Sequence, residues 1–92
     1  MRVAISKRRA KRLAAGVIEH AADLGVWYLT LYTVANGTCA PFGATPHESF
    51  GDALLDGNDT LKCRDDDWTD VDEAELDEYI IANTINAWNV EG

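Results

Sequence analysis

The chain has 92 residues, 47% of them hydrophobic and 26% charged, which fits one small folded domain and excludes general disorder. Its net charge of −8 is unevenly spread: the first twelve residues carry six basic side chains and no acidic one, whereas residues 13–92 carry two basic and sixteen acidic ones. No stretch has the roughly 18 uncharged apolar residues of a membrane span, and we expect one domain over residues 1–92 in the cytoplasm.

The first predicted element is an amphipathic helix from Lys7 to Leu24. Its apolar residues recur at steps of three and four, which places them on one side of a helix. Ser6 is the expected cap at its start, and Gly25 is the expected cap at its end. Because cations are unfavourable near a helix N-terminus, the basic first turns call for a compensating anion. That anion is either the phosphate of a nucleic acid or the acidic part of the same chain.

A β-hairpin is predicted next, over residues 26–42. Its first strand is rich in β-branched and aromatic residues, and Asn36-Gly37 is a strong signal for a hairpin turn. Pro41 places the returning strand at a sheet edge or ends it early, since proline cannot donate to the hydrogen-bond ladder. We expect the core face of the first strand to carry Trp27, Leu29 and Leu31.

The segment after the hairpin predicts a short helix. Thr45 is a suitable N-cap, Pro46 suits the first helical position and Glu48 can return to the cap. The helix should run to about residue 56, and the alternation over residues 60–64 predicts a brief third strand. A hairpin followed by this Gly-x-Thr-Pro-x-Glu start resembles small antitoxin domains of the HicB type over roughly residues 28–54. Capping alone explains the motif, and no function is transferred from the resemblance.

The last predicted element is a helix from a cap at Asp70 to about Asn89. Acidic residues surround the axis of its first half, so these turns should project into solvent or face a positive partner. The second half has one apolar stripe with Ile81 and another with Ile80, on different sides of the axis. Either the core wraps both stripes, or one packs on the sheet and the other on a second copy in a homodimer.

Together these elements predict an α+β fold. The expected order is helix, two strands, short helix, strand and helix. The antiparallel sheet has about three strands, including the hairpin, and packs against the two longer N-terminal and C-terminal helices and the short one.

Catalytic and metal-binding motifs are lacking. No nucleophile stands beside a base, so we expect no enzymatic activity and no cofactor. Asp65-x-Asp67-x-Thr69 begins like a calcium-binding loop, but its sixth residue is not glycine and its twelfth is not glutamate. Cysteine and histidine lack the close spacing of a zinc site, and no metal site is predicted. The expected state of the cysteines is two small apolar thiols, Cys39 and Cys63.

The favoured functional hypothesis is an acidic protein-binding module that mimics nucleic acid. Its carboxylates would meet the basic surface of a nucleic-acid-binding enzyme or ribonucleoprotein and inhibit it. Small anti-restriction and anti-CRISPR proteins work in this style, and the chain resembles them in size and acidity. The candidate contact residues are Asp65, Asp66, Asp67, Trp68, Asp70, Asp72, Glu73, Glu75, Asp77, Glu78 and Tyr79.

Two alternatives remain open from the sequence. The first is a nucleic-acid-binding regulator, although the net charge of −14 over residues 13–92 would repel nucleic acid. The second is an acidic soluble domain whose charge has no binding role. The candidate phosphate contacts of the first alternative are Lys7, Arg8, Arg9, Lys11 and Arg12.

Overall fold

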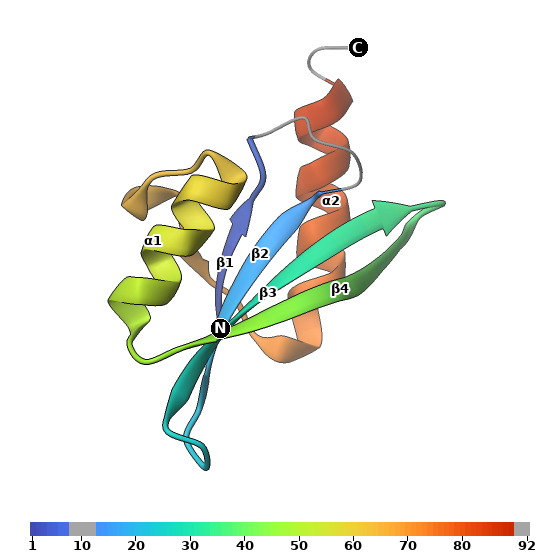
Figure 1. Ribbon diagram of the computed structural model, residues 1–92. Helices are drawn as coiled ribbons and strands as arrows, with labels where there is room; N and C mark the ends of the chain where they lie inside the picture. Colours follow the sequence, from blue (N-terminus) through green and yellow to red (C-terminus); the bar gives the residue numbers. More distant parts are fainter. Residues whose placement is uncertain (8–12, 90–92) are drawn as a thin grey trace.

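The computed structural model describes residues 1–7 and 13–89, with side chains described as far as Thr84. In this part of the chain an antiparallel sheet lies between two α-helices (Figure 1). The strands are β1 (Arg2–Ile5), β2 (Ala15–Ala21), β3 (Val26–Ala35), β4 (Thr38–His47) and β5 (Thr69–Asp70). The helices are α1 (Phe50–Leu61) and α2 (Leu76–Asn89), with 3-10 turns η1 (Asp65–Asp67) and η2 (Glu73–Glu75).

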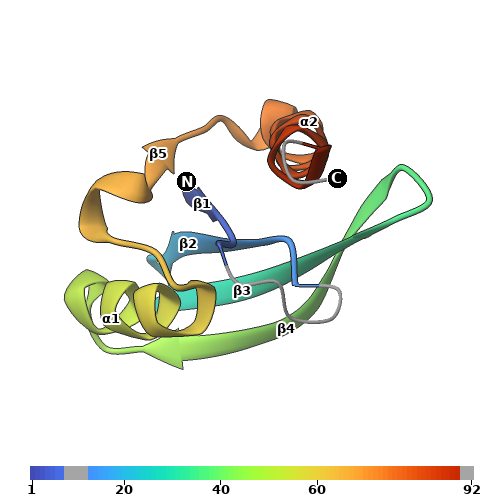
Figure 2. The ribbon, with the colours of Figure 1, turned by 90° about the horizontal axis from the view of Figure 1, so that it is seen from above.

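The five strands stand in the order β4-β3-β2-β1-β5. Successive side chains of a strand point to opposite faces of a sheet. Accordingly, Ala4 and Ile18 belong to the cluster that α1 covers, and their neighbours Val3 and Val17 belong to the cluster that α2 covers. Seen from above, the two helices lie on opposite sides of the sheet (Figure 2).

The α+β class and the antiparallel sheet are confirmed, but the predicted N-terminal helix is wrong. Residues 2–5 and 15–21 are the central strands β1 and β2. Every residue from Leu13 to Ile18 is buried, because the middle of the sheet is covered on both faces. A strand of this kind shows a continuous apolar run, which a helix also tolerates. Of the predicted basic cluster, residues 8–12 lie outside the described residues.

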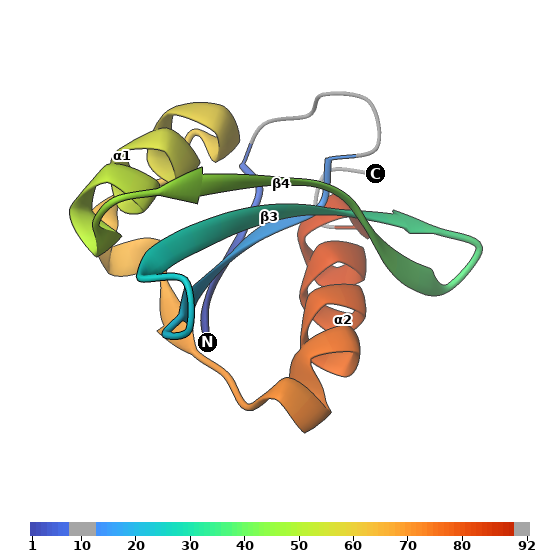
Figure 3. The ribbon, with the colours of Figure 1, turned by 60° about the horizontal axis from the view of Figure 1, so that its bottom comes forward.

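The predicted hairpin is confirmed, and its returning strand is longer than expected. β4 continues to His47, forms one edge of the sheet as its prolines require, and has a β-bulge opposite Leu31 and Tyr32. Asn36 and Gly37 both have positive φ, 54° and 73°, as a tight hairpin turn demands. The tip of the hairpin extends away from the body of the sheet (Figure 3).

The helix start predicted at Thr45 is wrong, because Thr45 and Pro46 belong to β4. The N-cap of α1 is Ser49, whose Oγ accepts a hydrogen bond from the Asp52 N–H at 3.1 Å. The helix then runs through Gly57 to Leu61, so the third strand predicted over residues 60–64 is also wrong.

The C-terminal helix is confirmed as an element, but Asp70 does not cap it. Asp70 lies in β5, opposite Arg2 of β1, and α2 begins six residues later at Leu76. Leu76, Ile80 and Thr84 form its buried side. Ile81 is half-buried, and the rest of its predicted stripe lies beyond the described side chains, so a homodimer through α2 stays a prediction. No described helix is long and apolar enough to span a lipid bilayer.

Candidate functional site

The acidic residues among the predicted contacts fall into two structurally different groups. The first is the acidic turn, residues 64–68, which connects α1 to β5 and contains η1. The second is the acidic segment, residues 70–78, which runs along the outside from β5 through η2 into α2 (Figures 1 and 3). The first group is tied to the rest of the protein, and the second is open to solvent.

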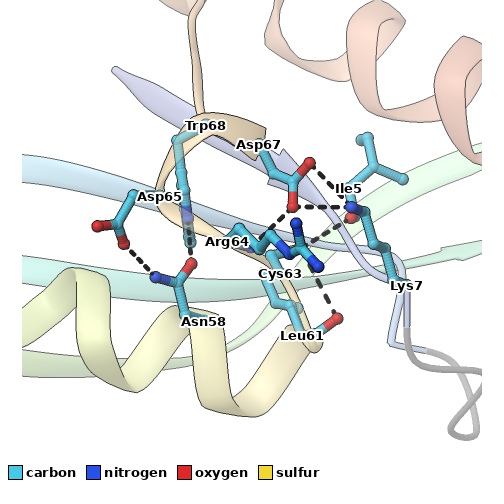
Figure 4. Close-up of polar contacts among 9 residues, drawn as sticks. All are labelled: Ile5, Lys7, Asn58, Leu61, Cys63, Arg64, Asp65, Asp67 and Trp68. Atoms are coloured by element: carbon cyan, nitrogen blue, oxygen red, sulfur yellow. Dashed lines mark hydrogen bonds and ion pairs between the residues drawn. The ribbon is translucent and has the colours of Figure 1, made fainter.

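In the acidic turn, Asp67 is neutralised by a residue far away in sequence. Its two carboxylate oxygens lie 2.9 and 2.8 Å from Lys7 Nζ, and Oδ2 also accepts the Arg64 N–H at 2.7 Å (Figure 4). The hydrogen bond from the Lys7 ammonium lowers the pKa of Asp67, and the Arg64 N–H adds to this effect. Asp67 therefore links the acidic turn to Lys7, which follows β1. Lys7, a candidate phosphate contact, already holds an anion.

Asn58 of α1 fixes the other side of the acidic turn. Its Nδ2 donates to Asp65 Oδ1 at 2.7 Å, and its Oδ1 accepts the Trp68 Nε1–H at 2.7 Å (Figure 4). Trp68 is only 5% exposed and packs in the cluster that α1 covers. A partner cannot contact its ring, so the structure gives Trp68 a core role where the sequence indicated an anchor. Asp66 remains exposed.

Removing the Asp67 charge is expected to destabilise the protein only at pH values at which the Asp67 carboxyl group is ionised. Because the folded state lowers the pKa of Asp67 below 3.8, its carboxylate stabilises the fold at neutral pH. This contribution is lost as the pH falls through the folded-state pKa. Asp67→Asn should therefore lower the urea midpoint at neutral pH and match the parent protein in strong acid. Asp66→Asn is the control and should change neither midpoint; identical behaviour of the two variants would contradict a stabilising role of the ion pair.

The acidic segment has a different environment. All six of its carboxylates are exposed, and only Asp70 has an ion pair with a described residue, the N-terminal amine at 3.5 Å. Tyr79, the last candidate contact, is half-buried against the cluster that α2 covers. The exposed carboxylates are Asp70, Asp72, Glu73, Glu75, Asp77 and Glu78.

The carboxylates of the acidic segment also affect the pKa of a residue in the hairpin, Tyr32. Burial is the main cause that raises the pKa of Tyr32 in β3; Cys39, which is negative only as a thiolate at high pH, and the carboxylates of Asp77, Glu19 and Glu73 raise it further. Carboxylates from β2, η2 and α2 therefore act on one side of the sheet. Sequence reasoning missed Glu19, because the predicted helix placed it on a different surface.

The histidines and cysteines make separate contacts within the fold. His47 Nε2 lies 3.0 Å from Asp56 Oδ2, which ties the end of β4 to α1, and the His20 ring stacks on Trp27. Cys63 is buried and Cys39 is half-buried, in clusters on opposite faces of the sheet, and burial raises the pKa of both thiols. In the part of the chain that the structure describes, no three potential ligands are placed to hold a metal ion.

No protein-family model, curated protein or solved structure matches this chain. The feature that distinguishes the acidic segment is its six exposed carboxylates within nine residues, separated only by Val71, Ala74 and Leu76.

Proposed function

We propose that this protein is a non-enzymatic acidic module that binds a basic surface of a nucleic-acid-binding enzyme or ribonucleoprotein and inhibits it. The observation that carries the proposal is the exposure of the six carboxylates of the acidic segment, with a single ion pair to the described residues. Like charges held this close repel one another and weaken the folded state. A cationic partner surface would remove this cost on binding.

The class of partner follows from the chemistry of the exposed carboxylates of the acidic segment. Proteins that bind nucleic acid line their sites with lysine and arginine to neutralise phosphates. A row of carboxylates is attracted to such a site over long range and competes with the phosphates for it. This mode matches anti-restriction and anti-CRISPR proteins, which the chain resembles in size and acidity. We restrict the proposed face to residues 70–78 and the exposed Asp66, because Asp65, Asp67 and Trp68 make hydrogen bonds within the protein.

A capture experiment with matched charge reversals tests the proposal. The tagged full chain is mixed with lysate of the source organism at low salt, and the bound proteins are identified by mass spectrometry. We expect a basic nucleic-acid-binding protein whose nucleic acid is displaced by the purified chain. Reversal of two exposed carboxylates in the variant Glu75→Lys/Glu78→Lys should weaken its affinity by about tenfold or more, since each exposed ion pair contributes up to about 1 kcal/mol and reversal adds repulsion.

The control is Glu48→Lys/Asp59→Lys, which makes the same change in net charge at two exposed positions outside the acidic segment. It should keep affinity within about twofold, apart from the shared long-range effect of net charge. Equal loss in both variants, or no loss in either, would refute a specific acidic face. Salt-sensitive binding of the parent chain to duplex DNA, reduced by neutralising Arg8, Arg9 and Arg12, would instead support the nucleic-acid-binding alternative.

A further inference from the structure

The strand β2 is longer than the strand β1 that pairs with it. Arg2 of β1 stands opposite Ile18, whereas β2 continues to Ala21. Beyond Ile18, β2 pairs with β3 on one side and with no described residue on the other. Among the described residues, His20 and Ala21 of β2 therefore have a partner strand on one side only, that of β3.

The direction of the backbone groups of these two residues follows from the hydrogen-bond alternation. The Ser6 N–H donates to the Ala14 carbonyl at 2.8 Å, and this pair stands in the β1–β2 register. In an antiparallel pair, hydrogen-bonded positions recur at every second residue, so Arg2 and Ile18 form such a pair. The next position on β2 is His20. Its N–H and carbonyl point away from β3, into the space beyond the start of β1.

That space is a cavity of about 380 Å³, which we call the notch. Ile18, Glu19 and His20 of β2 and Trp27 of β3 contribute to its lining. Asp72 and Glu73 of the acidic segment contribute as well, together with the first two residues of the chain. The notch thus joins this side of β2 to the exposed carboxylates.

The charges around the notch favour a cation. Glu19, Asp72 and Glu73 are exposed and have no ion pair with a described residue. Met1 and Arg2 also line the notch, so two cations stand beside the three carboxylates, and each has a contact of its own. The Met1 ammonium donates to the Val71 carbonyl at 3.2 Å and pairs with Asp70, and the Arg2 guanidinium lies 5.8 Å from the centre of the Phe50 ring.

One wall of the notch is aromatic and well supported. The Trp27 ring stacks on the His20 ring, with 4.4 Å between the ring centres. It also packs against Phe50 in an edge-to-face arrangement, with 5.3 Å between the ring centres. Aromatic side chains held in place in this way provide the apolar contact that exposed charges lack, and they attract cations over their faces. Of the two tryptophans whose side chains the structure describes, Trp27, and not the buried Trp68, is therefore available to a ligand.

We propose that the notch binds an extended segment of the basic partner that contains lysine or arginine. The backbone of this segment pairs with His20, and its basic side chains contact Glu19, Asp72 and Glu73. Strand addition of this kind takes affinity from main-chain hydrogen bonds and specificity from side chains. Nucleic acid is disfavoured because its phosphates would meet three carboxylates. The inference rests on the proposed function and specifies which part of the partner is recognised.

A peptide titration tests the site directly. Acetylated and amidated tetra-arginine is added to the isotope-labelled full chain at low salt, and amide and indole signals are followed by NMR. We expect the largest changes at residues 19–21 and the Trp27 indole. Glu19→Lys should weaken binding by about five- to tenfold, whereas Glu48→Lys, with the same change in net charge, should change affinity by less than twofold. Tetra-arginine methylated at its backbone nitrogens should bind several-fold more weakly, because it cannot donate to the His20 carbonyl.

The outcomes separate this inference from the proposed function. Signal changes confined to residues 75–78, or equal affinity of the methylated and unmethylated peptides, would overturn strand addition in the notch. If Glu75→Lys/Glu78→Lys abolishes capture of the natural partner and Glu19→Lys leaves it unchanged, the inference fails and the proposed function stands. If neither variant affects capture, both fail.

Discussion

Replacing Trp68 with alanine is expected to lower the free energy of unfolding by about 3–5 kcal/mol, as deletion of a buried tryptophan usually does. The indole is 5% exposed, and its Nε1–H is bonded to Asn58. A domain of this size has a total stability of roughly 5–14 kcal/mol, so the variant should lose a large part of it. Urea unfolding followed by circular dichroism measures the change.

Trp68→Phe is the companion variant, because it keeps one aromatic ring in the core while removing the second ring of the indole and the hydrogen bond to Asn58. It should cost less than Trp68→Ala, about 1–3 kcal/mol, through the unpaired Asn58 oxygen and the smaller ring. The pair of variants also checks the assignment of Trp68 to the core. If Trp68→Ala retained full stability and lost partner binding, the ring would be a contact residue, as the sequence alone indicated.

Replacing Gly57 with alanine is expected to destabilise the protein by about 1–3 kcal/mol, the usual cost of overpacking a core. The same change in the interior of an exposed helix normally stabilises it by about 0.5–1 kcal/mol. At Gly57 the added Cβ would lie 2.6 Å from Trp68 Cζ2 and 2.7 Å from Trp68 Cη2. The ring is packed from other sides as well, so it cannot move away without loss of contacts.

Gly51→Ala in the same helix is the matched control. A Cβ at Gly51 would have no neighbour closer than Ser49 Oγ, at 3.8 Å. This variant should leave stability unchanged or raise it by up to about 1 kcal/mol. A loss of stability in Gly57→Ala, together with no loss in Gly51→Ala, would confirm that α1 lies close to the Trp68 indole at position 57. A stabilising effect at Gly57 would contradict it.

The close packing at Gly57 also explains why the sequence misled at this point. A glycine after a short apolar stretch predicts a helix end, because glycine readily adopts the conformation found there. Here Gly57 is buried inside α1, and the helix ends at Lys62, whose φ is 58°. Glycine is required at position 57 for space, and that requirement comes from Trp68, eleven residues further along the chain.

The sequence by itself determined the hairpin and the separation of charge. The turn at Asn36-Gly37 depends on neighbouring residues only, and an ionised side chain carries its charge in whatever fold it occupies. Only the tertiary structure decided that residues 15–21 form a strand, since their apolar run suits a helix or a doubly covered strand, and burial on both faces selects the strand. It also decided which carboxylates are neutralised: Asp67 meets Lys7 from sixty residues away, and the six carboxylates of residues 70–78 remain exposed. The physical reason is that an ion pair requires contact in space, which the order of residues does not specify.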